Sequence, residues 1–278
     1  MKSDREVFLD GYNDIIKTVS SSPYVIYGAG SFGKRFLGCM QRMGLDACFK
    51  GFAVTKADET QKDLVSIESV DRSTYIVIAS HNESAKEMER LVRELGFEKY
   101  VLLFPYLQEF ELGLPIRYDE TIDVEALVEK LSRRFSNNMT VYLLAMDSTM
   151  QDNISGKELY IRLMDALSSS HETSVKRYEQ LKLRCMAYSK GDHSREDYNI
   201  KVNSDKNLVV DGLHRLMMAY YFGRKELKAD IYNFDENDKA LSRFVYVNDH
   251  TDEFFTEGQV KVIKAGFDKY GCYKGGKQ

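Results

Sequence analysis

The residues best suited to chemistry form the segment Asp211-Gly-Leu-His-Arg215 in the second half of the chain. The apolar run Leu208–Val210 before it predicts a short strand. The segment Leu213–Phe222 predicts a helix, and Gly223 ends it in the manner of a C-terminal capping glycine. The chemistry-bearing residues therefore lie where a strand turns into a helix.

Such a turn suits a phosphate group. His214 and Arg215 fall in the first turn of the predicted helix, beside free backbone N–H groups that attract anions. Asp211 lies close enough in sequence to hold a metal ion that bridges phosphates. A capping aspartate beside a surface arginine would also fit a plain strand–helix turn, but it leaves the combination of Asp, Gly, His and Arg unexplained.

This stretch resembles the ParB/sulfiredoxin superfamily. The resemblance rests on Gly212, the pair His214-Arg215, Ala219 and Gly223. It is closest to the free serine kinases of that superfamily, which carry Asp-Gly-His-His-Arg at this junction. It implies an α+β fold, and binding of ATP or CTP by Gly212, His214 and Arg215. An ATP-dependent enzyme of this kind implies Mg²⁺ as well, with Asp211 and His214 as catalytic residues and Asp211 as the metal ligand.

Two activities of the superfamily do not fit this chain. Leu213 stands where sulfiredoxin carries its catalytic cysteine, so repair of peroxiredoxin is not expected. Chromosome-partitioning proteins continue into DNA-binding helices, whereas here the short remainder is acidic, with Asp252, Glu253 and Glu257. Of the activities known in the superfamily, phosphotransfer to a small molecule and nucleotide sensing are the two that still fit this chain.

A second group of candidates precedes the predicted helix Val175–Tyr188. Glu172 would act as a general base on a hydroxyl if it lay near the γ-phosphate. Lys176 and Arg177 would neutralise the charge of a transferring phosphoryl group. A capping box with surface charges explains the same residues about as well. Asp147, after an apolar run, is a weaker candidate carboxylate.

The first half has its own phosphate-type loop, Gly28-Ala-Gly30-Ser31-Phe-Gly33. It follows the predicted strand Tyr24–Tyr27 and opens the predicted helix Ser31–Met43, which is the context that this glycine pattern requires. In such loops the glycines permit a tight turn, close approach of a phosphate and packing of the helix on the strand. A tight turn without a ligand is the alternative.

A nicotinamide dinucleotide is not expected at this loop. Its ribose is usually held by an acidic residue at the end of the second strand, but here the sequence gives Lys56, and the first acid is Asp58. A nucleotide-sugar fits better. His81 follows the third predicted strand and is placed to touch a ligand, whereas Asn82 suits the capping position of the next helix.

This half resembles the small Rossmann-like domains of bacterial surface-polysaccharide enzymes and their regulators. The resemblance is carried by Tyr27–Gly33, Gly51-Phe52 and Ile76–Ala79, within about the first hundred residues. It implies a nucleotide-binding fold and a place for the protein in polysaccharide biosynthesis.

The remaining pattern divides the chain in two. Strands and helices alternate up to Pro105, which predicts a parallel sheet with helices on its faces. The segment from Pro105 to Pro115 shows no clear period and predicts a boundary, with a Rossmann-like domain at 1–115 and a ParB/sulfiredoxin-like α+β domain at 116–278. In the second half, helices are predicted at Ile122–Phe135, Lys157–Leu167, Val175–Tyr188 and Gly258–Tyr270, and strands at Tyr198–Val202, Leu208–Val210 and Lys228–Tyr232.

Composition excludes several classes of protein. Residues 1–115 carry 14 basic and 17 acidic side chains, and residues 116–278 carry 25 and 26, so neither half has the basic excess of a nucleic-acid binder. The 4 scattered cysteines predict free thiols. No stretch reaches the ~18 apolar residues of a membrane span. We expect a cytoplasmic protein that binds a nucleotide and a small substrate, and the sequence allows a homodimer.

Two functions follow from these residues. The first is an ATP-dependent phosphotransferase that acts on a small hydroxyl compound such as an amino acid, a polyol or a sugar. The second is a non-catalytic regulator or scaffold in which the same loop senses ATP or CTP. The carboxylates Asp211 and Glu172 favour the enzyme, because phosphoryl transfer needs mainly positioning and charge stabilisation.

Overall fold

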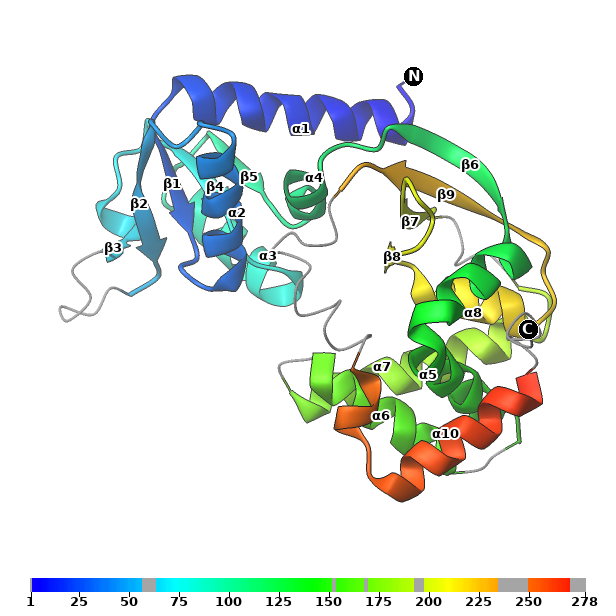
Figure 1. The fold of residues 1–278 in the computed structure, drawn as a ribbon. Helices are drawn as coiled ribbons and strands as arrows, with labels where there is room; N and C mark the ends of the chain where they lie inside the picture. Colours follow the sequence, from blue (N-terminus) through cyan, green and yellow to red (C-terminus); the bar gives the residue numbers. More distant parts are fainter. Residues whose placement is uncertain are drawn as a thin grey trace. The chain divides into compact units, whose positions relative to one another are not determined.

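The computed structural model describes residues 2–56, 64–151, 154–167, 170–192, 198–234 and 250–270. The chain divides into two compact units, Met1–Leu114 and Pro115–Gln278, whose elements are labelled in Figure 1. We call them unit 1 and unit 2.

Unit 1 is built on a five-stranded parallel sheet with the order β3-β2-β1-β4-β5. Its strands are β1 (Tyr24–Tyr27), β2 (Phe49–Val54), β3 (Leu64–Ser66), β4 (Tyr75–Ile78) and β5 (Tyr100–Leu102). Its helices are α1 (Asp4–Ser21), α2 (Ser31–Arg42), η1 (Ile67–Ser69), α3 (Asn82–Glu94) and α4 (Leu107–Leu112). The strand order reverses between β1 and β4, which is where sheets of this kind bind ligands.

The side chains of β1 alternate between the two faces of this sheet. Tyr24 and Ile26 join the core formed with α1, α2 and α4. Val25 and Tyr27 join a second core formed with α3 and η1. Helices therefore cover both faces, and unit 1 is an α/β unit with a parallel sheet, as the alternating pattern predicts.

The segment between Pro105 and Pro115 is more ordered than its sequence suggests. It contains α4, and Leu107, Phe110 and Leu112 on this helix are buried. Glu111 also accepts two hydrogen bonds of 2.5 Å from Arg35 on α2. Helix α4 is therefore a packed part of unit 1.

Unit 2 combines a mixed four-stranded sheet with a group of helices. The sheet has the order β6-β9-β7-β8, in which β7 and β9 are parallel and the other neighbours are antiparallel. Its strands are β6 (Arg117–Asp123), β7 (Ile200–Asn203), β8 (Val209–Asp211) and β9 (Glu226–Tyr232). Its helices are α5 (Val124–Gln151), α6 (Ser155–Leu167), α7 (His171–Tyr188), α8 (Leu213–Tyr221), η3 (Thr251–Phe254) and α10 (Glu257–Tyr270).

The start of unit 2 differs from the helix predicted at Ile122–Phe135. Strand β6 runs to Asp123, and the carboxylate of Asp123 accepts a hydrogen bond of 2.7 Å from the backbone of Ala126. This capping bond starts α5 at Val124. The helix then continues through a kink at Phe135, with φ −110° and ψ 28°, to Gln151.

Helix α5 organises the helical group. It contacts α6, α7, α8 and α10, and Figure 1 shows it among these helices. Nearly every residue of its second half is buried, from Asn138 to Ser148. None of the helices in the described ranges is long and apolar enough to cross a membrane. Cys39, Cys48 and Cys185 are free thiols, and Cys272 lies outside the described residues.

Candidate functional site

The predicted strand–helix junction of unit 2 turns on Gly212. This residue has φ +91°, and a Cβ atom there would lie 2.6 Å from Cγ2 of Ile200. Only glycine combines that backbone conformation with so little space. No side chain of the described residues caps α8, and no acidic residue lies in its first turn. Backbone N–H groups at the start of a helix are the kind of partner that binds an anion.

Arg215 braces this junction. One of its terminal nitrogens lies 3.6 Å from the carboxylate of Asp211, and the other donates a hydrogen bond to the backbone carbonyl of Tyr198. Its side chain is only 13% exposed, whereas that of Asp211 is 52% exposed. Arg215 thus uses its guanidinium group to hold Asp211 and the backbone at Tyr198. The carboxylate of Asp211 remains half-exposed to solvent.

The ring of His214 lies among the helices. Its Nε2 is hydrogen-bonded to the hydroxyl of Tyr160 on α6, and the ring of Tyr142 on α5 meets it edge-on at 4.8 Å. Burial, assisted by the positive charges of Arg184, Arg177 and Arg215, lowers the pKa of His214 to about 3. The sequence interpretation treats His214 as a titratable group in an anion site. This partly buried ring is instead neutral at physiological pH and cannot add positive charge.

The two tyrosines beside His214 are also neutral. Burial raises the pKa of Tyr142 and of Tyr160 above the usual value for a phenol. The positive charges of Arg177 and Arg184 act against this rise at Tyr160 without reversing it. Tyr142, Tyr160 and His214 are therefore all neutral. The positive charges that act on His214 belong to Arg177, Arg184 and Arg215.

Two of these arginines lie on α7. Arg177 and Arg184 are seven positions apart, about two turns, and so share one face of the helix. Nη1 of Arg177 lies 3.8 Å from the sulfur of Met164 on α6. Within the part of the chain that the structure describes, neither forms an ion pair with a carboxylate. The sequence singled out Arg177 but not Arg184, although the seven-residue spacing on a predicted helix could have revealed the second.

Glu172 and Lys176 lie elsewhere on α7. Their charged groups are 2.7 Å apart, and their side chains are 77% and 70% exposed. The hydrogen bond from Lys176 lowers the pKa of Glu172, which makes it a weaker base. Ser170 caps α7 by accepting a hydrogen bond from the backbone of Thr173. The structure pairs Glu172 and Lys176 with each other in solvent, as surface charges on the first turns of a capped helix.

Asp147, the weaker carboxylate candidate, holds three helices together. Its carboxylate accepts a hydrogen bond of 2.8 Å from Tyr221 at the end of α8, and bonds from Lys269 and Tyr270 at the end of α10. Burial raises the pKa of Asp147, but these hydrogen bonds outweigh burial and the pKa is lowered. A buried carboxylate with so many donors has a structural role.

The glycine loop of unit 1 has the close packing that its pattern predicts. Gly28 has φ +116°, and a Cβ atom there would lie 2.8 Å from the carbonyl of Ala79. A Cβ atom at Gly33 would lie 2.1 Å from the carbonyl of Gly28, so α2 approaches the loop as only glycine permits. Gly30 occupies the capping position of α2 in open space, and Ser31 is the exposed first residue of the helix.

Aromatic rings gather at the same edge of this sheet. The ring of His81, after β4, stacks on Phe32 of α2 at 5.1 Å and lies 5.9 Å from Phe104, after β5. Phe104 is 50% exposed. Neither phenylalanine is marked by the sequence, since only the strand order brings them together. His81 also takes the capping position of α3 that was expected of Asn82, which is the first residue of the helix.

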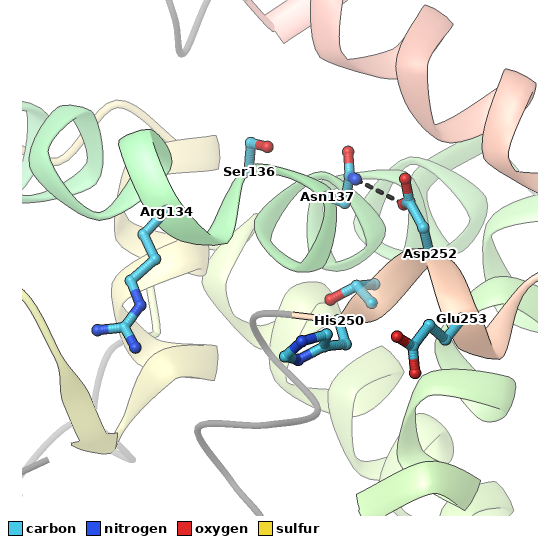
Figure 2. A pocket seen from close by; sticks show the side chains of 7 residues that line it. Arg134, Ser136, Asn137, His250, Asp252 and Glu253 are labelled. Carbon is cyan, nitrogen blue, oxygen red and sulfur yellow. Dashed lines mark hydrogen bonds between the residues drawn. The ribbon is translucent and has the colours of Figure 1, made fainter. Parts of the chain in front are cut away.

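A pocket of about 250 Å³ lies beside the kink of α5. Its lining residues are Arg134, Ser136, Asn137, His250, Thr251, Asp252 and Glu253. Figure 2 shows the 2.6 Å hydrogen bond that Asn137 donates to Asp252, with Arg134 pointing away from this pair. Sequence analysis does not predict this pocket, because Asn137 and Asp252, which meet in it, are 115 residues apart.

The described residues contain no group of three or more His, Cys, Asp or Glu side chains that would hold a metal ion by themselves. Asp211 presents a half-exposed carboxylate at the start of α8. Comparison of the chain with models of protein families, with curated proteins and with solved structures found no match.

Proposed function

We propose that the protein is an ATP-dependent phosphotransferase that acts on a small hydroxyl-bearing metabolite, with unit 2 as the catalytic unit. The observation that carries this proposal is the start of α8 at Gly212, where no side chain of the described residues caps the helix and where Asp211 lies beside Arg215. Backbone N–H groups and guanidinium groups are the partners that phosphates prefer in proteins. Transfer of a phosphoryl group needs little beyond such positioning and charge stabilisation.

The fold assignment belongs to the same proposal. We assign unit 1 to the Rossmann-like domains, supported by its parallel sheet and by the glycine loop after β1. We assign unit 2 to the ParB/sulfiredoxin-like domains, supported by the β8–Gly212–α8 junction and by β9, which follows α8. The polysaccharide context suggested for unit 1 makes a sugar or polyol a suitable acceptor.

Asp211 takes the main chemical role in this proposal. Its carboxylate is half-exposed at the start of α8 and is oriented by Arg215. Mg²⁺ commonly binds through one or two carboxylates, phosphate oxygens and several waters, and this site offers such a carboxylate. When bound there, Mg²⁺ would neutralise phosphate charge. Glu172 fits the part of general base poorly, because it is paired with Lys176 in solvent.

The alternative is a non-catalytic regulator that binds ATP or CTP. The surface position of Glu172 favours it, because it removes one of the two carboxylates that favoured catalysis. Arg215 favours it too, since its contacts already couple the loop to Asp211 and to the backbone at Tyr198.

The two functions are distinguished by incubating the full chain with ATP, Mg²⁺ and a pool of small metabolites while ADP release is measured. We expect acceptor-dependent ADP that falls at least about 100-fold in Asp211→Asn. The matched control is Asp205→Asn, an exposed aspartate between β7 and β8, which should stay within about twofold of wild type. Nucleotide binding without turnover would establish the regulator, and absence of both would reject the site.

A further inference from the structure

Tyr198 lies just before β7 in unit 2 and exposes its ring to solvent. It is 79% exposed, more than any other large apolar or aromatic residue among those that the structure describes. A single exposed ring is common on protein surfaces and carries no functional meaning by itself. Tyr198 differs from such a ring in the way its backbone is held and in what lies next to it.

Contacts on both sides fix the backbone of Tyr198. Its carbonyl oxygen accepts a hydrogen bond from the guanidinium of Arg215 on α8. The next residue, Asn199, donates hydrogen bonds of 2.7 Å to the carboxylates of Asp119 and Asp230. The chain then enters β7, which lies between β8 and β9 in the sheet. A tyrosine on such a backbone loses little freedom when a ligand covers it, because only its two side-chain torsions remain to be ordered.

The same part of the chain lies beside the start of α8. Arg215, which bonds the carbonyl of Tyr198, also lies 3.6 Å from the carboxylate of Asp211. Ile200 packs so closely on Gly212 that a Cβ atom at the glycine would lie 2.6 Å from it. Tyr198 is two residues from Ile200, so their Cα atoms are at most about 7 Å apart. Tyr198 and Asp211 are both exposed, and a ligand that bridges them therefore binds at the surface.

We propose that the ring of Tyr198 stacks on the base of the nucleotide whose phosphates bind at the start of α8. This inference rests on the proposed nucleotide-binding function and deepens it, because it assigns the base to a residue outside the segment Asp211–Arg215. Arg215 then holds both ends of the site, since it contacts Asp211 and the carbonyl of Tyr198. Stacking on an aromatic ring tolerates every base, so this contact admits ATP and CTP alike.

The test is calorimetric titration of the full chain with ATP and with inorganic tripolyphosphate, at one ionic strength and one Mg²⁺ concentration. We expect Tyr198→Ala to weaken ATP binding about 5- to 150-fold, the effect of removing one stacked ring. Tripolyphosphate binding should change less than about twofold, because this ligand has no base. Tyr198→Phe keeps the ring and should bind ATP like wild type.

Two further measurements separate stacking from a structural effect. In the ADP-release assay, Tyr198→Ala should raise the KM for ATP and leave kcat within about twofold, because the ring touches only the base. Its melting temperature should match that of wild type, since the ring is exposed. Leu183→Ala, which truncates another exposed side chain of unit 2, is the matched control and should change neither affinity nor KM.

ATP affinity that is unchanged in Tyr198→Ala overturns the inference. An equal loss for ATP and tripolyphosphate also overturns it, because Tyr198 would then support the loop and not bind the base. So does a loss in Tyr198→Phe as large as in Tyr198→Ala. In each of these cases, a wild-type chain that binds ATP and loses turnover in Asp211→Asn retains the proposed function. A wild-type chain that binds neither ATP nor tripolyphosphate overturns both.

Discussion

Nε2 of His214, the second residue of α8, is hydrogen-bonded to the hydroxyl of Tyr160 on α6. This bond fixes the start of the helix that carries the proposed phosphate site to the helical group behind it. It also places an imidazole where burial and neighbouring arginines oppose its protonation. His214 is thereby a support for the site rather than a source of charge.

The first prediction concerns pH. The pKa of His214 is about 3 in the folded chain, below the usual 6.5 of an unfolded chain. As pH falls through 6.5, the unfolded chain therefore takes up a proton that the folded chain does not. The free energy of unfolding is therefore unaffected by His214 above about pH 7. Below pH 6.5 it falls by up to ~1.4 kcal/mol for each pH unit.

Denaturant unfolding at pH 7.5 and pH 5.0 measures this loss. Carboxylates contribute to the same slope, so the informative quantity is the difference between wild type and His214→Gln. The variant should lose less stability between the two pH values. Equal losses would show that His214 titrates normally in the folded chain.

The second prediction concerns Asp147. Asp147→Ala removes hydrogen bonds from Tyr221, Lys269 and Tyr270 and should lower the free energy of unfolding by about 2–4 kcal/mol. Lys269→Gln removes only a half-exposed partner and should cost less than about 1 kcal/mol. Denaturant melts of both variants make the comparison, and a cost for Asp147→Ala as small as that of Lys269→Gln would contradict a structural role.

The third prediction concerns the link between the units. Helix α4 is packed into unit 1, and the backbone N–H of Ile116 already donates to Ile231 in unit 2. The first cut of limited proteolysis should therefore fall at Gly113–Pro115, within the broader window that the sequence suggests. Mass spectrometry of the fragments locates the cut. A first cut inside α4 would contradict this prediction, because it would show that α4 unfolds locally more readily than the segment Gly113–Pro115 is cleaved.

The fourth prediction concerns unit 1. The full chain should bind a nucleotide-sugar but not NAD, because Lys56 follows β2 where a ribose-binding acid is usual. Asp58, the first acid, lies outside the described residues. If the base stacks on the exposed ring of Phe104, Phe104→Ala should weaken binding by about 1–3 kcal/mol, the range for base stacking in single-stranded nucleic-acid binders.

Calorimetry with NAD, NADP and a panel of nucleotide-sugars tests this prediction. Val65→Ala, an exposed apolar change on the edge strand β3, is the matched control and should bind like wild type. Micromolar NAD binding would refute the argument from the missing acid.

Sequence patterns predicted most of the strands and helices that are marked by a run or a period of apolar residues. Strands β1 and β4 are continuous apolar runs rich in β-branched residues, and both are buried as predicted. Strand β6 was missed, because Arg117–Asp123 alternates charged residues with few apolar ones and, among the described strands, lies at the sheet edge beside β9. The second half of α5 was missed as a helix, since a helix that is buried on all sides lacks amphipathic periodicity.

The site was predictable only where it is contiguous in sequence. The turn of Gly212, with Asp211 and Arg215 around it, follows from neighbouring residues. The rings that contact His214 come from α5 and α6, and Tyr160 lies 54 residues away in sequence. No local pattern reveals that a histidine in a first turn will point at a tyrosine on another helix, and its loss of charge was therefore not foreseen.

The burial of α5 by neighbouring helices affects how fast different parts of unit 2 exchange their amide hydrogens with solvent. From Asn138 to Ser148 its backbone is shielded by other helices, so these amide hydrogens exchange with solvent only when the whole unit opens. Helix α8 ends near the surface and is fastened to this scaffold through His214 and Asp147. We therefore expect the terminal amides of α8, the helix that carries the proposed phosphate site, to exchange with solvent before those of α5 do.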